Sequence, residues 1–333
     1  MQATAQDMER IERIRERVVG MYSRHPWPST RRADEEMGWR LRMLGIAPDD
    51  FRGKRVLDSG CGTGEYALWY ATHGAASVLG VDLSEGSLAL AEQRRAQAEV
   101  ANASFRRMDV LKLDLKDESF DYSYSVGVLH HTGDPARGFR ELCRVTRPGG
   151  VVIVSLYSSF SRLRLRWKQA LCKLLGGDDV DRRALIGRRL FFNTMRKMNQ
   201  RYHETNYELI SYDVFGFPHE SLHSAGEVLG WFDECGIDYL GSFAPLRARD
   251  YLYAFALPEY REFRSTFAGY PLVRAVADAT SRLATVLFSI PPAGEVRRFR
   301  RPGPASRLAT QLLWFGIGDR INCFTIAGRK PVR

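Results

Sequence analysis

An acidic residue and three glycines follow a short apolar run and have the spacing of a ligand-binding turn. Within residues 54–66 (KRVLDSGCGTGEY), the run ends in Asp58, and Gly60, Gly62 and Gly64 follow at alternate positions before a helical pattern begins. Glycine has no Cβ, so such a turn can adopt positive φ and lets a ligand lie against bare backbone. The helix behind the turn offers unpaired N–H groups. We therefore predict a strand, a tight turn and a helix around a bound ligand.

The residue after the third glycine separates two classes of nucleotide-like ligand. The dinucleotide fingerprint G-x-G-x-x-G would need a glycine where this sequence has Glu65. A carboxylate at that position would repel a pyrophosphate. The spacing G-x-G-x-G after an acidic residue is instead typical of proteins that bind S-adenosyl-L-methionine (SAM). Acidic neighbours favour that ligand because it carries a sulfonium and an ammonium group.

Five motifs in order resemble the class I SAM-dependent methyltransferases. They are VLDSGCGTGEY at 56–66, GVDLS at 80–84, MDV at 108–110, SVGVLHHTGDP at 125–135 and RVTRPGGVVIVSLY at 144–157. The resemblance implies an α/β, Rossmann-like fold, in which a seven-stranded mixed sheet with an antiparallel last strand has helices on both faces. HPWPS at 25–29, FPHESLHSAGEVLGWFDECGI at 217–237 and FTIAGRKP at 324–331 further resemble a bacterial, Methyltransferase-11-like subgroup of unknown substrate.

The resemblance also implies which residues hold SAM, whose product would be S-adenosyl-L-homocysteine. Asp58 would orient the turn and the methionyl amine, Asp82 would accept both ribose hydroxyls, and Asp109 would accept from the adenine amine. The full set expected to bind the cofactor is Asp58, Gly60, Cys61, Gly62, Gly64, Asp82, Leu83, Asp109, Val110, Val126 and Gly127.

Candidates for the chemistry are fewer and each has a structural alternative. Methyl transfer needs alignment of the nucleophile, and it needs a general base only if the nucleophile arrives protonated. The catalytic candidates are His131, His130 and Tyr22; the candidates for acceptor contact are His25, Trp27, Tyr157, Tyr212, His219 and His223. Each of these side chains could equally serve packing. No metal is predicted, because the spaced histidines of the PHESLHS segment have no cysteine partner nearby.

Strand and helix patterns alternate through the centre of the chain, which predicts a parallel sheet. We expect strands at 55–58, 77–82, 103–107, 119–126, 151–157, 237–243 and 323–330, and helices at 5–22, 34–45, 64–73, 86–99, 135–145, 160–175, 182–201, 225–235 and 271–288; 212–224 is expected to be irregular. The expected organisation is an N-terminal helical lid (1–48), the SAM-binding core (49–157), a basic helical cap insertion (158–222), a core helix and strand (223–244), a second cap insertion (245–318) and the final core strand and tail (319–333).

The net charge of +10 over 333 residues is concentrated in one segment. Residues 160–201 hold 12 Lys/Arg against 3 Asp, whereas residues 50–157 hold 13 Lys/Arg against 14 Asp/Glu. A basic face can meet an anionic membrane surface or nucleic acid, or it can simply be solvated. The helix at 160–175 carries the apolar stripe Leu163, Trp167, Leu171 and Leu174, and its arginines interleave with leucines rather than with exposed aromatics, which disfavours nucleic acid.

Composition and processing signals point to a cytoplasmic protein. The sequence has no run of 18 apolar residues and no apolar region behind the charged N-terminus, so neither a membrane span nor a signal peptide is expected. Its five scattered cysteines include no C-x-x-C pair and fit a reducing compartment, with peripheral association at the inner membrane surface left open.

We therefore predict SN2 methyl transfer to a small-molecule or lipid-like acceptor held under a helical cap. Two alternatives stay open: an RNA (tRNA or rRNA) methyltransferase that uses the basic insertion, and a non-catalytic SAM-binding partner protein. The sequence does not identify the acceptor, the methylated atom or the oligomeric state.

Overall fold

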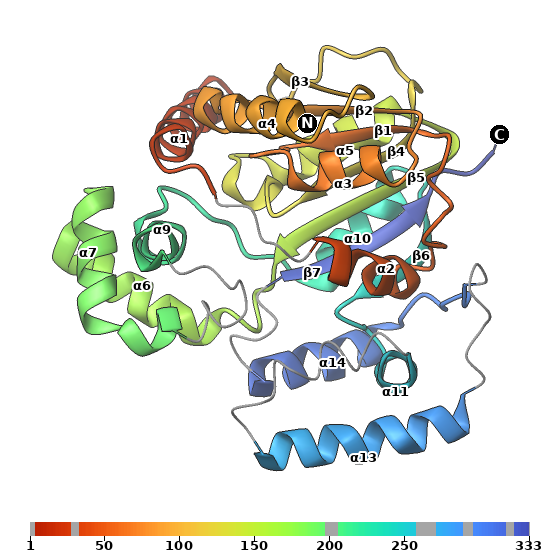
Figure 1. Cartoon of the computed structure of the whole chain (residues 1–333). Coiled ribbons are helices and arrows are strands. Elements are labelled where there is room, and N and C mark those ends of the chain that lie inside the picture. Colours follow the sequence, from red (N-terminus) through yellow and green to blue (C-terminus); the bar gives the residue numbers. More distant parts are fainter. Residues whose placement is uncertain are drawn as a thin grey trace.

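Seven strands form one sheet in the order β3-β2-β1-β4-β5-β7-β6 (Figure 1). The computed structural model describes residues 4–27, 33–196, 206–257, 271–288, 296–317 and 323–332. The strands are β1 (Arg55–Ser59), β2 (Ser77–Asp82), β3 (Ala103–Arg107), β4 (Phe120–Val126), β5 (Thr146–Tyr157), β6 (Asp238–Phe243) and β7 (Cys323–Arg329).

The last strand runs against its neighbours, as expected. β1 pairs in parallel with β2 and β4, and β7 pairs antiparallel with both β5 and β6. The carboxyl ends of β1, β2 and β4 therefore lie at one edge of the sheet, where open α/β sheets bind their ligands. The predicted Rossmann-like mixed sheet is confirmed.

Helices cover both faces of the sheet, because its central strands are apolar on both sides. In β5, Val152 and Val154 belong to one core, and Val151 and Ile153 belong to the other. The first core includes side chains of α5 (Pro135–Val145), α10 (Ala225–Glu234) and α14 (Pro304–Ile317), and the second includes side chains of α2 (Ala33–Met43) and α3 (Glu65–Thr72). Two further helices, α4 (Glu85–Gln97) and α1 (Ala5–Arg24), pack against each other beside β2 and β3.

A second group of helices lies outside these layers (Figure 1). It comprises α6 (Leu163–Gly176), α7 (Val180–Leu190), α9 (Tyr207–Ser211), the π-helical turn η2 (Tyr212–Gly216), α11 (Ala248–Ala256) and α13 (Pro271–Leu287). The first four share a small core of their own, which includes Leu165, Ile210 and Phe215. These helices come from the two segments expected to be insertions, and the division into lid, core and caps stays a prediction.

Three local expectations need correction. β5 begins at Thr146, so Pro148-Gly149-Gly150 lies within the extended strand rather than before it, since Lys330 exchanges hydrogen bonds with Gly149 and Gly150. The expected helix at 182–201 is interrupted: α7 begins at Val180 and ends at Leu190, and residues 192–196 are helical again. Residues 197–201 lie outside the described residues. The segment at 212–224, expected to be irregular, opens with the π-helical turn η2.

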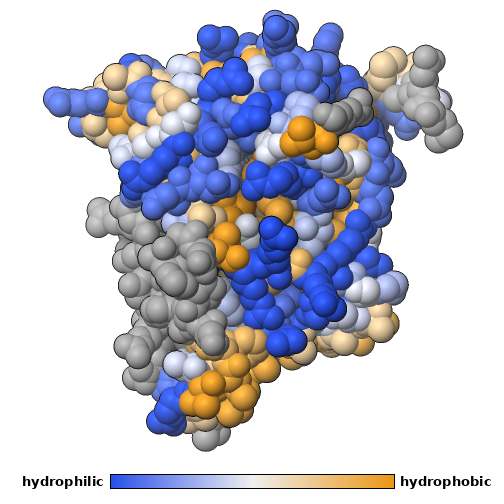
Figure 2. All heavy atoms as spheres, turned by 90° about the vertical axis from the view of Figure 1, so that its right-hand side faces the viewer, coloured by the Kyte–Doolittle hydropathy of each residue, from blue (hydrophilic) through white to orange (hydrophobic). Residues whose placement is uncertain are grey.

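The surface carries apolar side chains on its outer helices. Figure 2 shows a hydrophobic patch at the lower edge of the molecule, where Figure 1 places α13. Leu283, Val286 and Leu287 of this helix are exposed. Within the described ranges, every helix is too short or too polar to cross a bilayer.

Candidate functional site

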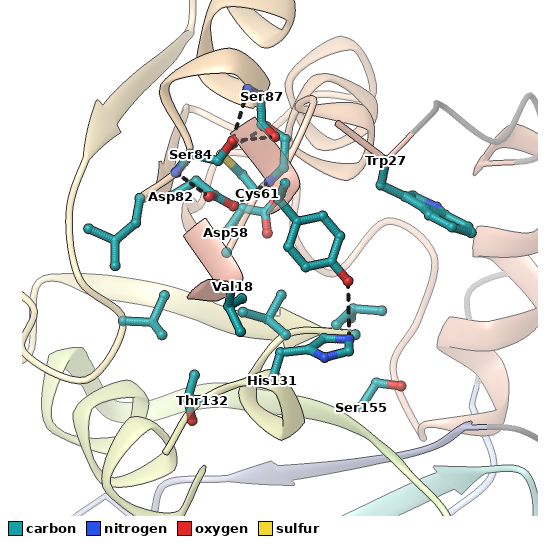
Figure 3. A pocket seen from close by; sticks show the side chains of 18 of the residues that line it. Val18, Trp27, Asp58, Cys61, Asp82, Ser84, Ser87, His131, Thr132 and Ser155 are labelled. Carbon is teal, nitrogen blue, oxygen red and sulfur yellow. Dashed lines mark hydrogen bonds between the residues drawn. The ribbon is translucent and has the colours of Figure 1, made fainter. Parts of the chain in front are cut away.

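A cavity of about 330 Å³ lies at the carboxyl ends of β1, β2 and β4. Figure 3 shows its wall, with Asp82, Ser84 and Ser87 toward one end and His131 and Ser155 toward the other. Ten of the eleven residues expected to bind SAM line it: Asp58, Gly60, Cys61, Gly62, Asp82, Leu83, Asp109, Val110, Val126 and Gly127. Tyr22, Trp27, His131 and Tyr157 also line it.

The Asp82 side chain at the end of β2 is held by hydrogen bonds from two backbone amides, one of them in the glycine turn. The amide of Gly62 donates to Asp82 Oδ2 (2.9 Å), and the amide of Ser84 donates to Asp82 Oδ1 (2.8 Å). Gly62 and Gly127 have φ of +50° and +78°, and a Cβ on either would meet no atom within 4 Å. Both glycines therefore present bare backbone to open space in the cavity, as a cradle for a ligand requires.

Asp58 is a buried carboxylate with an unused oxygen. Among the described residues, its Oδ2 has no hydrogen-bond partner. Burial raises the pKa of Asp58 to about 7, against the opposing effect of the Tyr124 hydroxyl, and the nearby Asp82 charge adds to that rise. Burial also raises the pKa of Asp82. A cationic group placed between these side chains would stabilise both in the ionised form.

The helix α1 closes one side of the cavity. Arg15 of α1 donates to Asp109 Oδ2 (3.1 Å), and Ile11, Val18, Val19 and Tyr22 of the same helix line the wall. Two glycines permit this approach. A Cβ on Gly133 would lie 2.8 Å from Ile11 Cγ1, and a Cβ on Gly86 would lie 2.5 Å from the carbonyl oxygen of Ser23.

Three polar side chains from distant segments meet at the far end of the cavity. The Tyr22 hydroxyl lies 3.3 Å from His131 Nε2 and 3.3 Å from Asp213 Oδ1. His131 lies in the 3₁₀ turn η1 (Leu129–His131) that follows β4, and its Nδ1 lies 2.9 Å from the carbonyl oxygen of His219. Because a carbonyl can only accept, Nδ1 carries the proton and the lone pair of Nε2 faces Tyr22.

The charges of this trio follow from their burial. Burial lowers the pKa of His131 to about 4, against the opposing hydrogen bond to His219, so the imidazole is neutral near pH 7. Burial raises the pKa of Asp213 to about 6, with Arg162 opposing the rise. Burial likewise raises the pKa of the Tyr22 phenol, which keeps its proton. A neutral acceptor nitrogen and a mostly ionised carboxylate therefore flank one hydroxyl.

Several expected site residues lie outside the cavity wall. Gly64 packs against the core instead, since a Cβ there would lie 2.8 Å from Phe105 Cζ. His130 is fully buried and stacks on Tyr157, with 3.6 Å between the ring centres. The structure does not support His130 as a residue that contacts an acceptor, because its ring is fully buried against Tyr157.

The remaining acceptor candidates have structural partners. His25 stacks on Tyr212 with 3.8 Å between ring centres. His223 contacts Ser221 through Nε2 (2.7 Å) and Glu227 through Nδ1 (2.9 Å), which ties the PHESLHS segment to α10. His219 contributes its backbone carbonyl, which fixes the tautomer of His131. None of these four side chains is among the residues of the cavity wall described here.

The sequence analysis did not include three charged residues among the candidates for the site. One is Asp213, for which an acidic residue inside the apolar run YDVFGF was the available signal. The other two, Arg162 and Glu220, form a buried ion pair (2.9 Å); the Arg162 guanidinium lies 3.6 Å from the centre of the Tyr157 ring. These residues come from segments whose contacts with the sheet leave no periodic pattern in the sequence.

Comparisons with known proteins agree with the sheet and the cavity. Residues 57–154 match the family model described as a methyltransferase domain. An uncharacterized protein of Synechococcus sp. is 28% identical over 250 residues, 68% of this chain and 60% of that protein. The 27-O-demethylrifamycin SV methyltransferase of Amycolatopsis mediterranei is 36% identical over 37% of this chain and 46% of its own length. The ubiquinone biosynthesis O-methyltransferase of Neisseria meningitidis is 38% identical over 32% and 45%. The matches thus span 45–60% of these relatives.

Residues 57–154 form a class I SAM-dependent methyltransferase domain. The cavity itself fits the cofactor: the unpartnered Asp58 oxygen suits a cationic amine, and Gly62 and Gly127 leave room for a ligand against the backbone. No cluster of three or more His, Cys, Asp or Glu that could hold a metal ion occurs in the described part of the chain.

Proposed function

We propose that this protein transfers the methyl group of SAM to a hydroxyl of a small-molecule acceptor in the cavity. Three observations support the proposal: the methyltransferase domain match, the cationic-ligand chemistry of the Asp58 and Asp82 end, and a neutral histidine at the other end. The observation that carries the choice of a hydroxyl is His131 Nε2, a neutral acceptor nitrogen that contacts the Tyr22 hydroxyl (3.3 Å) and that an acceptor hydroxyl could contact in its place. Relatives that are named O-methyltransferases are consistent with it.

The cofactor-binding roles remain as predicted from the sequence, with Gly64 reassigned to packing. Asp58 would hold the methionyl amine and Asp82 the ribose hydroxyls, with its two amide hydrogen bonds fixing the carboxylate in place. Asp109 would accept from the adenine amine beside Arg15, which already donates to one of its oxygens. When bound, SAM supplies a methyl group made electrophilic by its sulfonium.

Tyr22, His131 and Asp213 would accept the proton of the acceptor hydroxyl and stabilise the resulting charge. The acceptor oxygen would bond to the methyl carbon as the carbon–sulfur bond of the cofactor breaks and S-adenosyl-L-homocysteine leaves, and the proton of the acceptor O–H would pass to His131 Nε2. The His219 carbonyl holds the ring in the required tautomer, and the Asp213 charge across Tyr22 stabilises the resulting imidazolium. The α1 side chains over the cavity would exclude water from this exchange.

The experiment follows radiolabel from methyl-labelled SAM into a fractionated bacterial extract. We expect label in the small-molecule pool, or in lipid if the acceptor is lipid-like. Label that nuclease treatment releases from RNA would favour the alternative that uses the basic insertion. No transfer despite SAM binding would favour a non-catalytic partner protein.

A matched pair of variants tests the role of His131 once an acceptor is found. His131→Asn keeps a donor for the His219 carbonyl but removes the base, and should lower kcat by about 10²–10⁴-fold. His73→Asn at the far end of α3 is the control and should leave kcat unchanged. Equal kcat for His131→Asn and the wild type would exclude a base at this position.

A further inference from the structure

The helix α6 turns an apolar stripe away from the protein. Three residues of the predicted stripe, Leu163, Trp167 and Leu174, are 55%, 57% and 81% exposed. The fourth, Leu171, is half-buried, and one edge of the Trp167 ring packs on Phe191. The side that packs against α7 and η2 instead uses Leu165 and Cys172, which are buried. An amphipathic helix normally buries its apolar stripe, so the outward orientation calls for a partner.

The charges beside the stripe are of one sign. Arg164, Arg166 and Lys173 are exposed on α6, and the helix contains no acidic residue. Apolar side chains with an indole, flanked by arginine and lysine, are typical of helices that lie in the interface of an anionic bilayer.

A second helix extends this face. Leu308, Leu312 and Phe315 of α14 are exposed, and α14 also contains no acidic residue. The Arg164 guanidinium lies 5.0 Å from the centre of the Phe315 ring, so side chains of α6 and α14 meet there. We call these six apolar residues and the three basic residues of α6 the α6–α14 face.

We propose that the α6–α14 face binds an anionic lipid surface. A second copy of the chain is a poorer partner, because a two-fold interface would bring the same basic side chains of both copies together. Single-stranded nucleic acid would need aromatic platforms for its bases, whereas four of the six apolar residues are leucines.

The proposed face lies next to the acceptor end of the cavity. Arg162, one residue before α6, stacks on Tyr157, whose ring lines the cavity. A docked α6 would therefore hold this wall of the cavity close to the lipid. The docking itself goes beyond the proposed function and does not depend on methyl transfer.

The test is co-sedimentation of the full chain with vesicles. Vesicles of phosphatidylcholine with 30% phosphatidylglycerol should bind the protein, pure phosphatidylcholine should bind it at least tenfold more weakly, and moderate salt should weaken binding to the anionic vesicles. Brominated lipid should quench a fluorescence component that Trp167→Phe removes. Absence of binding at any phosphatidylglycerol fraction would refute the proposal.

Matched variants locate the contact. Trp167→Ser with Leu174→Ser should lower the vesicle affinity at least tenfold, whereas Leu90→Ser with Val332→Ser, which removes apolar side chains exposed elsewhere, should not. A double variant, Arg164→Gln with Lys173→Gln, should weaken vesicle binding. The control double variant, Arg52→Gln with Arg107→Gln, removes the same charge from another face and should weaken vesicle binding less.

Three results would overturn the assignment: equal effects of the test and control pairs, loss of a dimer in the α6 variants, or RNA binding that vesicles cannot compete. SAM affinity, measured on every variant, reports whether the fold and the cofactor site survive. A failed vesicle experiment with intact SAM binding would leave the proposed function standing.

Discussion

Asp58 and Asp82 end two neighbouring strands, yet their carboxylates have different surroundings. Both Asp82 oxygens accept backbone amides, which hold the carboxylate in one orientation. Asp58 keeps one oxygen without a partner among the described residues. We infer that Asp82 is positioned in advance for hydroxyl groups, while Asp58 awaits a cation.

Asp82→Ala should weaken SAM binding at least tenfold, because the loss of even one hydrogen bond to a charged group costs roughly 1.5–3 kcal/mol. Isothermal titration calorimetry measures the affinity, and circular dichroism checks that the variant is folded. Asp114→Ala, at an exposed position outside the cavity wall, is the control. Unchanged affinity in Asp82→Ala would remove the ribose assignment.

SAM affinity should rise with pH up to about 7 and then level off. The pKa of Asp58 in the folded chain is about 7 instead of the usual 3.8, so below pH 7 the cationic amine must displace a proton from this carboxyl. Calorimetry in two buffers of different ionisation enthalpy should detect the released proton at pH 6. Asp58→Asn should bind more weakly and should lose the proton release; a variant that still releases it would place the proton elsewhere.

The raised pKa of Asp58 also affects the stability of the ligand-free chain. The contribution of this group to stability should fall as pH rises, whereas SAM affinity should rise. Since the folded chain keeps a proton that the unfolded chain loses above pH 3.8, this group disfavours the folded state increasingly as pH rises toward about 7. SAM binding should therefore stabilise the chain more at pH 8 than at pH 5, which thermal unfolding with and without SAM measures.

At the scale of elements, α1 lies over the cavity because two glycines let it approach. Gly133 precedes α5 and Gly86 lies in the first turn of α4, and neither has room for a Cβ beneath α1. The N-terminal helix is thus packed against the loops that follow β2 and β4, and it brings Arg15 and Tyr22 to the two ends of the site.

Gly133→Ala should displace α1 and loosen the closed site. A Cβ 2.8–3.1 Å from three atoms of Ile11 forces a shift, and overpacking of this kind typically costs about 1–3 kcal/mol. Limited proteolysis within residues 4–27 should quicken, and SAM affinity should fall. Gly230→Ala in α10, where a Cβ meets nothing within 4 Å, should instead stabilise the chain by about 0.5–1 kcal/mol. Equal protease resistance of the two variants would argue against close packing of α1.

At the scale of the whole molecule, four separate parts of the chain converge on one cavity. The parallel strands supply the carboxylates and glycines, α1 supplies Tyr22, η2 supplies Asp213, and β7 supplies Thr325. The π-helical turn matters here, because such turns redirect side chains and are frequent at functional sites. Tyr22 and Asp213 thus come from additions to the sheet, whereas Asp58, Asp82 and the glycines come from its strands and the turns that follow them.

Removal of residues 1–27 should leave a folded sheet with impaired turnover. These residues contribute no strand, so circular dichroism should still show a cooperatively unfolding α/β protein. The truncated chain loses Ile11, Arg15, Val18 and Tyr22 from the cavity wall, so SAM should bind more weakly and methyl transfer should fall much further. Full turnover in the truncated protein would exclude a lid role for α1.

The sequence by itself determined the sheet and most of the residues that line the Asp58 and Asp82 end of the cavity. Strand periodicity, the glycine turn and the acidic residues at strand ends are local signals, because parallel strands bring their carboxyl ends to one edge whatever the rest of the chain does. Ten of the expected cofactor residues consequently line the cavity, and the expected strand 103–107 agrees with β3.

Only the tertiary structure decided which side chains meet at the His131 end of the cavity. Which of two adjacent histidines faces the cavity depends on the 3₁₀ turn η1, and Asp213 reaches Tyr22 only because η2 packs against α6, α7 and α9 in a position that brings it there. Likewise, the stripe of α6 could be recognised in the sequence, but its outward orientation could not, since a helix with two apolar sides is ambiguous until its neighbours are placed. Contacts between segments nearly 200 residues apart leave no period in the sequence, so they had to be found in space.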